Sequence, residues 1–193
     1  MWLKNKDQYR KKYYLNEKPF FTVETLYGKK IGELMESPEE IAKHPVLMNV
    51  PRYPESEFSI KIEVEGIPIM GYIDSYDPDT HSFYEYKTSR TNMWTPVTVA
   101  KHLQLPFYSF LIEQSSGKVN RECHLIWLET AFLEKSIMFD GNELISDSRE
   151  LELTGKIVSF PRKIYKWERK LIKETIIRVA GEIHNDYNNF LKK

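Results

Sequence analysis

An aspartate and a Glu-x-Lys triplet occupy two consecutive apolar segments of the chain, GYID and EYK. Asp74 ends the first segment, and Glu85 and Lys87 stand two residues apart in the second. Residues i and i+2 of a strand point to the same face, so Glu85 and Lys87 are expected to project together. If the two segments pair in a sheet, Asp74 joins them. Two carboxylates and an ammonium group at one place suit a hard divalent cation and a polarised water molecule.

The same residues also have a purely structural reading. Acidic and basic residues often alternate on half-exposed strands, where charge pairs across strands stabilise hairpins slightly. The sequence that follows favours a functional site. Gln104 and Tyr108 stand at positions i and i+4 of a segment with helical pattern, so they share one face of a helix.

In this order, the segments GYID, EYKTS and HLQLPFY resemble the RecB-like branch of the PD-(D/E)xK nuclease superfamily. That branch pairs an Asp and a Glu-x-Lys on adjacent strands with a Gln-x-x-x-Tyr on the following helix. The resemblance covers residues 27–108. It implies an α/β fold with a restriction-endonuclease-like core: a mixed central sheet of about five strands, flanked by helices, with a long C-terminal helix.

The resemblance also implies a metal site. Asp74, Glu85 and the backbone carbonyl of Tyr86 would bind Mg²⁺ or Mn²⁺, which prefer oxygen ligands. Lys87 would orient the attacking water, help to deprotonate it, or neutralise the transition state, and the sequence does not choose among these roles.

Contacts to nucleic acid are implied around the same segment. Gln104 and Tyr108 would hydrogen-bond to the DNA backbone or to the catalytic side chains. Further candidates for nucleic-acid contacts come before them in the chain: Ser89, Arg90, Lys101 and His102.

The first helix departs from the family pattern. Many RecB-like members carry a histidine there, after Gly-x-x and one apolar residue. The matching stretch begins at Gly28 and has Gly32 at the histidine position. The next residue, Glu33, is predicted to replace the histidine as a ligand. Glu24 and Glu36 compete for this role, and a solvated helix acid without a role is the other reading.

Composition limits the class of protein and of partner. The chain has 193 residues, 41% hydrophobic and 13% aromatic, which suits one folded domain over residues 1–193. Its 28 basic and 28 acidic residues give no net charge, so attraction to DNA must come from a local basic surface. Two segments could provide such a basic surface. In residues 4–14 tyrosines follow Lys and Arg, and in residues 162–173 aromatic residues are interleaved with them. Either could bind phosphates and stack on bases, or could be a solvated helix face.

Several classes are excluded by the sequence. Cys123 is the single cysteine, so the chain forms no internal disulfide and cannot supply four cysteines to an iron–sulfur cluster or a zinc site. We find no apolar run that would span a membrane and no apolar core of a signal peptide at the N-terminus. A cytoplasmic protein is therefore expected. Nothing in the sequence indicates an oligomer, although one is possible.

Hydrophobic periodicity and turn residues predict the elements that position these residues. The expected helices are 25–35, a short turn at 39–43, 98–113 with a start or kink near Pro106, and a C-terminal helix with an apolar stripe over 172–190. The expected strands are 58–64, 67–76 and 81–89 as an antiparallel meander, then 121–129 and 132–140, with an acidic loop at 140–152.

Three functions remain open at this point. The first is a metal-dependent DNA nuclease, with exonuclease action preferred by similarity to RecB-like members, serving DNA recombination, repair or phage DNA metabolism. The second is a catalytically silent nuclease fold that binds DNA ends or a protein partner. The third is a structural protein with an accidental motif match. The complete set of Asp74, Glu85 and Lys87 favours the first.

Overall fold

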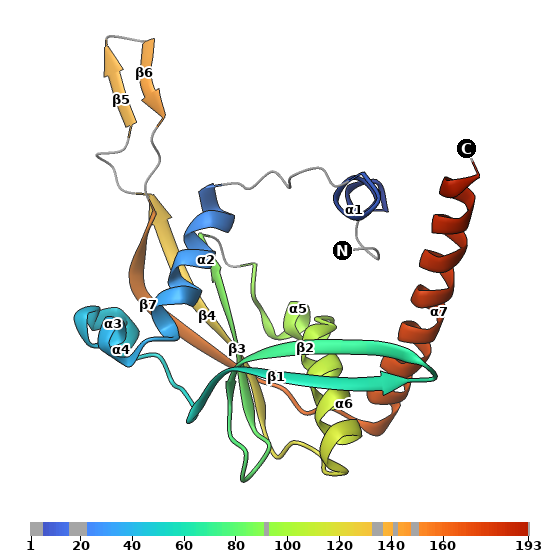
Figure 1. Ribbon diagram of the computed structural model, residues 1–193. Coiled ribbons are helices and arrows are strands. Elements are labelled where there is room, and N and C mark those ends of the chain that lie inside the picture. The colour runs from blue at the N-terminus through green and yellow to red at the C-terminus, as the bar shows by residue number, and fades with distance from the viewer. Residues whose placement is uncertain are drawn as a thin grey trace.

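A five-stranded mixed sheet with helices on both faces forms the body of the protein, and a two-stranded hairpin extends from it (Figure 1). The structure is a computed structural model, which describes residues 6–15, 23–90, 93–132, 137–140, 143–147 and 151–192. Within these ranges, no helix has both the length and the apolar character needed to cross a membrane.

The helices are α1 (Lys6–Tyr13), α2 (Val23–Met35), α3 (Pro38–Lys43), α4 (Pro45–Met48), α5 (Pro96–Ala100), α6 (Gln104–Ser116) and α7 (Lys166–Leu191). The strands are β1 (Glu55–Val64), β2 (Ile67–Tyr76), β3 (Phe83–Ser89), β4 (Cys123–Phe132), β5 (Ile137–Asp140), β6 (Glu143–Asp147) and β7 (Leu151–Pro161).

The strands of the main sheet follow the order β1-β2-β3-β4-β7. All neighbours are antiparallel except β3 and β4, which run parallel because the chain crosses over through α5 and α6 between them. β1 and β2 are joined by a two-residue turn in which Glu65 and Gly66 both have positive φ, 50° and 78°. Such turns fix the register of a hairpin. Val64 therefore lies opposite Ile67.

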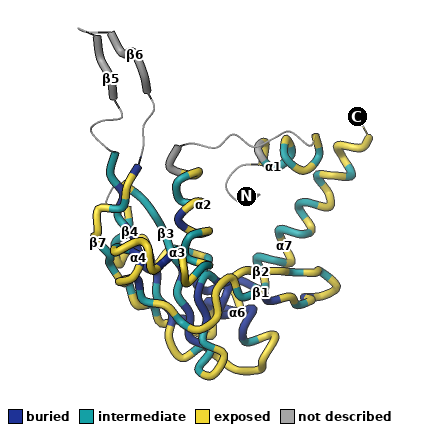
Figure 2. Tube along the Cα trace, turned by 60° about the vertical axis from the view of Figure 1, so that its left-hand side comes forward, coloured by how far each residue is buried: buried dark blue, intermediate teal, exposed yellow. Residues whose placement is uncertain are grey.

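Each face of the sheet carries its own apolar cluster. β4 lies inside the sheet, and its side chains alternate between the two clusters. Leu125 and Trp127 pack with α5, α6 and α7, whereas Ile126 and Leu128 pack with α2, α3 and α4. The buried residues gather along the sheet and α6 (Figure 2), so the two helical layers are held together through β4.

Most of the predicted elements are confirmed. The meander, the strand predicted at 121–129 (β4) and the C-terminal helix are present. The predicted helix 98–113 is divided into α5 and α6, and Pro106 lies in the first turn of α6, where a missing N–H breaks no helical bond.

The fifth strand of the sheet is β7, which the sequence did not predict. The expected strand 132–140 is wrong as a sheet member, since its described end, β5, pairs only with β6. The acidic segment 140–152 is not a plain loop, because it contains β6 and the start of β7. The pattern of β7 was obscured by Gly155, which has φ of 90°, and by a bulge in β7 itself, where the step from Leu153 to Ile157 lies opposite the shorter step from Thr130 to Leu128.

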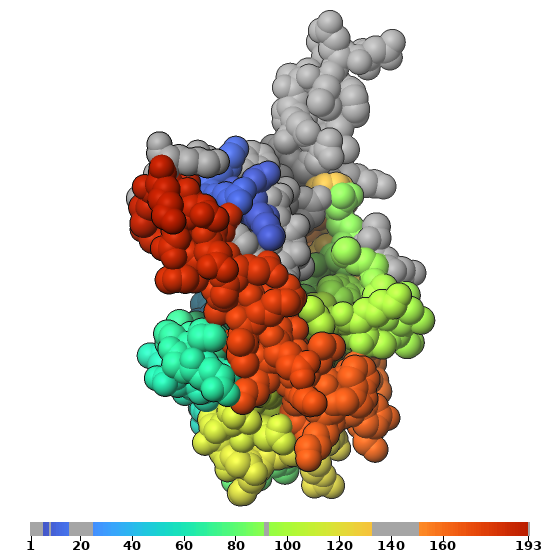
Figure 3. All heavy atoms as spheres, turned by 90° about the vertical axis from the view of Figure 1, so that its right-hand side faces the viewer, coloured from blue at the N-terminus to red at the C-terminus, as the bar shows by residue number. Residues whose placement is uncertain are grey.

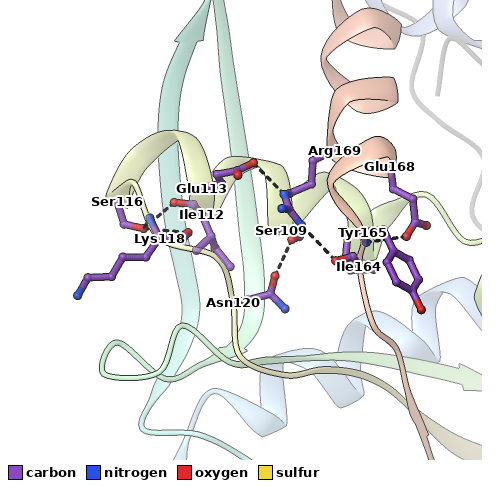
Figure 4. Close-up of polar contacts among 10 residues, drawn as sticks. All are labelled: Ser109, Ile112, Glu113, Ser116, Lys118, Asn120, Ile164, Tyr165, Glu168 and Arg169. Atoms are coloured by element: carbon purple, nitrogen blue, oxygen red, sulfur yellow. Dashed lines mark hydrogen bonds and ion pairs between the residues drawn. The ribbon is translucent and has the colours of Figure 1, made fainter.

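Helix α7 is tied to α6 by a buried arginine. Arg169 donates from Nε to Glu113 Oε2 at 2.8 Å and from Nη1 to the carbonyl of Ile164 at 3.1 Å (Figure 4). Glu168 accepts the backbone N–H of Tyr165 at 2.9 Å, which caps the N-terminus of α7. These contacts fix the direction in which α7 leaves the sheet.

The far end of α7 contacts the N-terminal helix. Arg10 of α1 forms an ion pair with Asp186, with Nε to Oδ2 at 2.9 Å. The hydroxyl of Tyr14 donates to the carbonyl of Ile183 at 3.3 Å, and its ring meets that of Tyr187 at 5.1 Å between centroids. The predicted apolar stripe of the C-terminal helix is thus a packing face along part of its length.

Candidate active site

The candidate site lies where β2 and β3 part. Their ladder contains the pair Ser75–Tyr84, and one residue beyond it Asp74 stands opposite Glu85. At this point the Asp74 carboxylate, rather than a backbone carbonyl, accepts the N–H of Tyr86 at 2.7 Å. The two acidic side chains therefore meet because a side chain has replaced a ladder bond.

A third carboxylate extends this row onto β1. Glu57 is opposite Asp74 in the antiparallel register of β1 and β2. Its φ is 50°, a left-handed conformation that is uncommon outside glycine and that often marks functional positions. Glu57, Asp74 and Glu85 thus stand side by side on three neighbouring strands.

These residues open into a cleft of about 480 Å³ between α2 and the sheet. Four acidic side chains line it: Glu36, Glu57, Asp74 and Glu85. Lys87 and Thr88 of β3 and Gln104 of α6 complete the polar part of the wall. The cleft therefore collects oxygen ligands together with one ammonium group.

Two glycines allow helices to approach the cleft closely. A Cβ at Gly28 of α2 would come within 2.8 Å of Thr88 Oγ1. A Cβ at Gly71 of β2 would lie 2.5 Å from Leu111 Cδ1 and 3.2 Å from Tyr108 Cε1 of α6. At distances below 3 Å the neighbouring group would have to move to admit a side chain. Gly71 thus allows α6 to pack closely against β2, and Gly28 allows α2 to pack closely against β3.

Glu85 is a buried carboxyl with two different oxygens. Its side chain is 1% exposed, and Oε1 forms an ion pair with Lys87 Nζ. Oε2 is also buried but has no hydrogen-bond partner among the described residues. Burial and the nearby charge of Asp74 raise the pKa of Glu85 to about 8, against the opposing effect of Lys87. The pKa of Asp74 is also raised by burial, although the Tyr86 N–H and Lys87 act in the other direction.

These features fit a hard divalent cation. A buried carboxylate oxygen without a hydrogen-bond partner costs free energy unless a cation or a donor lies beside it. Among the residues that the structure describes, no three His, Cys, Asp or Glu side chains are grouped closely enough to surround one metal ion. Mg²⁺ keeps several water ligands and needs few from the protein, so the predicted ligands Asp74, Glu85 and the carbonyl of Tyr86 would suffice without a third side chain.

Gln104 and Tyr108 occupy the first turns of α6. The Gln104 side-chain amide donates to the Tyr108 hydroxyl at 2.8 Å. Gln104 lines the cleft, whereas Tyr108 is 6% exposed and packs edge-on against Phe83 beneath it. Burial raises the pKa of Tyr108, and so does the charge of Glu85, which places this tyrosine behind the acidic row. Tyr108 therefore orients Gln104.

Glu33 does not take the position that was predicted for it. Its side chain is 62% exposed and lies 3.6 Å from Lys29 Nζ on the outer face of α2. Glu36, one of its competitors, lines the cleft instead. The motif position Gly32 lines the cleft, and Glu36 stands four residues later on the same face, whereas Glu33 directly follows Gly32 and is rotated about 100° away from it. The side chain of Glu24 is outside the described part of the chain.

The further candidates for nucleic-acid contacts stand apart from the cleft: Ser89, Arg90, Lys101 and His102. The guanidinium of Arg90 lies over the ring of Phe132, 4.1 Å from its centroid. The ring of His102 packs edge-on against Trp94. Lys101 is exposed at the end of α5. Contacts from these residues remain predictions about DNA that extends beyond the cleft.

The charged side chains of the two basic segments, residues 4–14 and 162–173, have different environments. Lys4 of the first segment is outside the described residues, and Arg10 pairs with Asp186. In the second segment, Arg162 and Arg169 are occupied by ion pairs inside the protein. The lysines of the second segment, by contrast, are on the surface.

Glu57 was missed at the level of sequence, although a signal for it existed. The turn at Glu65 and Gly66 predicts a two-residue hairpin loop. Counting back along both strands from that turn places Glu57 opposite Asp74. The hairpin register, rather than any motif, would have identified it.

Comparison with known proteins assigns the family. The model of the PD-(D/E)XK nuclease superfamily matches residues 13–187, so the chain belongs to that superfamily. No curated protein matches the sequence significantly.

Structural comparison finds two solved structures. A putative exonuclease from Eubacterium rectale has a TM-score of 0.51 and 9% identity, with 88% of this chain and 71% of that chain covered. The crystal structure of SSO0001 has a TM-score of 0.42 and 17% identity, with 81% of this chain covered. The matched region spans 57% of the SSO0001 chain. At these identities the likeness to the exonuclease concerns the fold alone.

Proposed function

We propose that this chain is a metal-dependent DNA nuclease that uses Asp74, Glu85 and Lys87, with exonuclease action preferred. The observation that carries the proposal is the state of Glu85. It is buried beside Asp74, with one oxygen on Lys87 and the other buried without a hydrogen-bond partner among the described residues. A purely structural carboxylate would have both oxygens satisfied.

Asp74, Glu85 and the carbonyl of Tyr86 would hold Mg²⁺ or Mn²⁺. When bound, the cation would make a water molecule more acidic and neutralise charge on the phosphate. The protein excludes water from one side of the site, because Glu85 is almost fully buried. It also supplies fixed orientation, because the Tyr86 N–H holds the Asp74 carboxylate.

Lys87 is the basic side chain that lines the cleft, and it would act next to the scissile bond. Its side chain is 27% exposed, so it reaches from the buried Glu85 toward the open cleft. There its ammonium group would orient the attacking water or stabilise charge that develops on the phosphate. Gln104, held by Tyr108, would donate to a non-bridging phosphate oxygen.

We further propose that Glu57 provides the additional carboxylate that was first expected from Glu33. Glu57 stands beside Asp74 in the row across β1, β2 and β3, and it lines the cleft. Exchange to Gln removes its charge but keeps its shape. Glu57→Gln should lower cleavage by tenfold or more at limiting Mn²⁺, the order of loss expected when support of a metal is removed, whereas Glu33→Gln should behave like the parent. Equal activity of both variants would contradict this assignment.

DNA as the substrate, and ends as the point of attack, rest on the RecB-like motif order. They agree with the description of the Eubacterium rectale protein as a putative exonuclease. DNA recombination, repair or phage DNA metabolism would be the setting. One observation favours a second candidate, a module that binds DNA ends without cutting: the described residues contain no ready-made group of three metal ligands.

Incubation with linear, circular and single-stranded DNA tests the proposal, with Mg²⁺, Mn²⁺, Ca²⁺ or EDTA in parallel. We expect loss of linear DNA with Mg²⁺ or Mn²⁺, protection of circular DNA, and no turnover with Ca²⁺ or EDTA. Asp74→Asn serves as the inactive control. DNA binding without cleavage under every condition would support the binding module, and cleavage that survives EDTA or Asp74→Asn would overturn the metal site.

A further inference from the structure

Two large apolar side chains on α7 are exposed to solvent. Trp167 is 64% exposed and Leu171 is 47% exposed. They are four residues apart on a helix, so they lie next to each other on one face, and Thr175 continues the same line. Figure 3 looks onto α7, shown orange to red, where it crosses the molecule. An exposed tryptophan of this kind is an unusual use of a side chain that is normally buried.

The line of exposed residues leads to an apolar groove. A groove of about 260 Å³ lies between α6 and α7, and Thr175 and Ile176 form its α7 side. Leu103, Gln104 and Phe107 form the other side. Gln104 also lines the catalytic cleft. Gln104 therefore borders both the groove and the cleft. The groove is lined mainly by apolar residues, whereas the cleft is lined by acidic ones.

Lysines flank this line on α7. Lys166 and Lys170 are one helical turn apart and both are exposed. Lys170 Nζ lies 3.8 Å from Glu174, a pair exposed to water and therefore weak. The chain has no net charge, so a local pair of lysines beside apolar residues is what would attract a polyanion here.

We propose that Trp167, Leu171 and the groove beside Gln104 form a binding track for an unpaired DNA strand. Nucleobases lie on the apolar residues, and phosphates meet Lys166 and Lys170. The track spans roughly 12 Å of helix between Trp167 and Thr175, from the rise of 1.5 Å per residue. It guides the strand toward the cleft, so this inference rests on the proposed nuclease function.

The chemistry of the surface selects this occupant. Every base has a flat apolar face that stacks on an aromatic ring, and such binding tolerates any sequence. A paired duplex hides these faces, so the track distinguishes single strands from duplex. A protein partner would have no need of continuity with the phosphodiester cleft, whereas a substrate strand requires it.

Equilibrium binding of fluorescent oligo(dT) in Ca²⁺, where no cleavage is expected, tests the track. Trp167→Ala should weaken binding at least fivefold, since one stacked base is worth about that much. Tyr72→Ala is the matched control, because Tyr72 is a 46% exposed aromatic on β2 outside the track. Thermal melting should be unchanged, since Trp167 is mostly in solvent. Equal affinity of parent and Trp167→Ala would overturn the track.

Salt dependence separates stacking from charge. Lys166→Gln combined with Lys170→Gln should lower the slope of log affinity against log salt by about 1.4, because a single strand contributes about 0.7 for each phosphate contact. Trp167→Ala should leave that slope unchanged. An unchanged slope in the double lysine variant would contradict phosphate binding on α7.

Kinetics distinguish failure of the track from failure of the nuclease. With a single-stranded substrate, Trp167→Ala should raise KM and leave kcat near the parental value, since Trp167 is outside the cleft. If the parent cuts no DNA but binds oligo(dT) through Trp167, the nuclease proposal fails and the track stands. If the parent cuts and Trp167→Ala has parental KM, the track fails and the nuclease stands.

Discussion

Glu85 shows how one residue in the cleft couples charge to stability. Its pKa is about 8 in the folded protein, above its ordinary value of 4.5, because the carboxyl is buried near Asp74. Between these two values the folded state holds a proton that the unfolded state releases. The stability of the metal-free protein should therefore be full below the ordinary pKa and fall as the pH rises through 8.

Glu85→Gln should remove this pH dependence. Glutamine keeps the shape of the side chain and stays neutral, so the metal-free variant should equal the parent near pH 5 and exceed its Tm at pH 8. We expect a gain of at least about 3 °C, since each kcal/mol shifts the Tm of a chain of this length by roughly 2–4 °C. Thermal melts in EDTA at several pH values measure it. Parallel pH profiles for both proteins would contradict the raised pKa.

Lys87 separates catalysis from binding. Its ammonium group contacts Glu85 but would not be a metal ligand. Lys87→Ala should lower the single-turnover cleavage rate by about 10²–10⁴-fold, the usual size of an acid–base or charge-stabilising contribution. DNA affinity in Ca²⁺ should change little, because one phosphate contact among several is lost.

The paired control for Lys87 is Glu85→Ala, which should weaken metal binding measured by calorimetry. If Lys87→Ala cuts DNA at the parental rate, the EYK segment is an ordinary strand, and the nuclease assignment loses its main support.

The residues of the cleft were predictable to different degrees. Asp74, Glu85 and Lys87 were identified by their order and spacing, and the structure brings them together around one cleft. Glu33 was predicted from a motif position, but helical rotation directs its side chain away from the cleft. Glu57 belongs to no motif, since only the pairing of β1 with β2 places it beside Asp74. Contacts between strands cannot be predicted from a local sequence pattern alone.

At the scale of elements, α2 depends on one of its two glycines. Gly28 and Gly32 lie one turn apart, but a Cβ at Gly28 would meet Thr88, whereas a Cβ at Gly32 would meet nothing within 4 Å. Gly32→Ala should raise the free energy of unfolding by about 0.5–1 kcal/mol through helix propensity. Gly28→Ala should instead lower it, because overpacking costs about 1–3 kcal/mol.

Chemical denaturation of both glycine variants measures the difference. The double variant Gly28→Ala with Thr88→Ala should recover much of the lost stability, since the smaller residue removes the atom that the new Cβ meets. If the double variant is no more stable than Gly28→Ala alone, the close approach of α2 to β3 is not the cause.

The contact between α6 and α7 is a second element-scale feature. Arg169 is 8% exposed and connects the two helices through Glu113 (Figure 4). Arg169→Ala should lower the free energy of unfolding by about 1–3 kcal/mol, because the partly buried Glu113 carboxylate and the Ile164 carbonyl lose their donor. Lys170→Ala, the neighbouring exposed position, should change it by less than about 0.5 kcal/mol. Similar values for both would mean that Arg169 is not structurally required.

Most elements followed from local pattern, and the exception has a physical cause. β1 alternates strictly between apolar and polar residues, so its strand was clear from the sequence. β7 carries a glycine with positive φ in its middle and is itself bulged there, so its alternation is broken. Such a strand forms because β4 offers it an open edge, which is information from the whole sheet.

At the scale of the whole molecule, two helical layers share one sheet. β4 is buried on both faces and belongs to both apolar clusters. The cleft lies in the layer formed by α2, and the proposed strand track lies in the layer formed by α6 and α7. Gln104 lines both the cleft and the groove, so it connects the two layers.

The contact of α1 with α7 has a kinetic consequence. Arg10 and Asp186 are 176 residues apart, so almost the whole chain must be ordered before this ion pair can form. It should close last during folding and open first under native conditions. Hydrogen–deuterium exchange should then show α1 amides exchanging far faster than those of β4, and Asp186→Asn should speed exchange in α1 alone. Equal acceleration in β4 would mean that this contact opens only when the whole molecule unfolds.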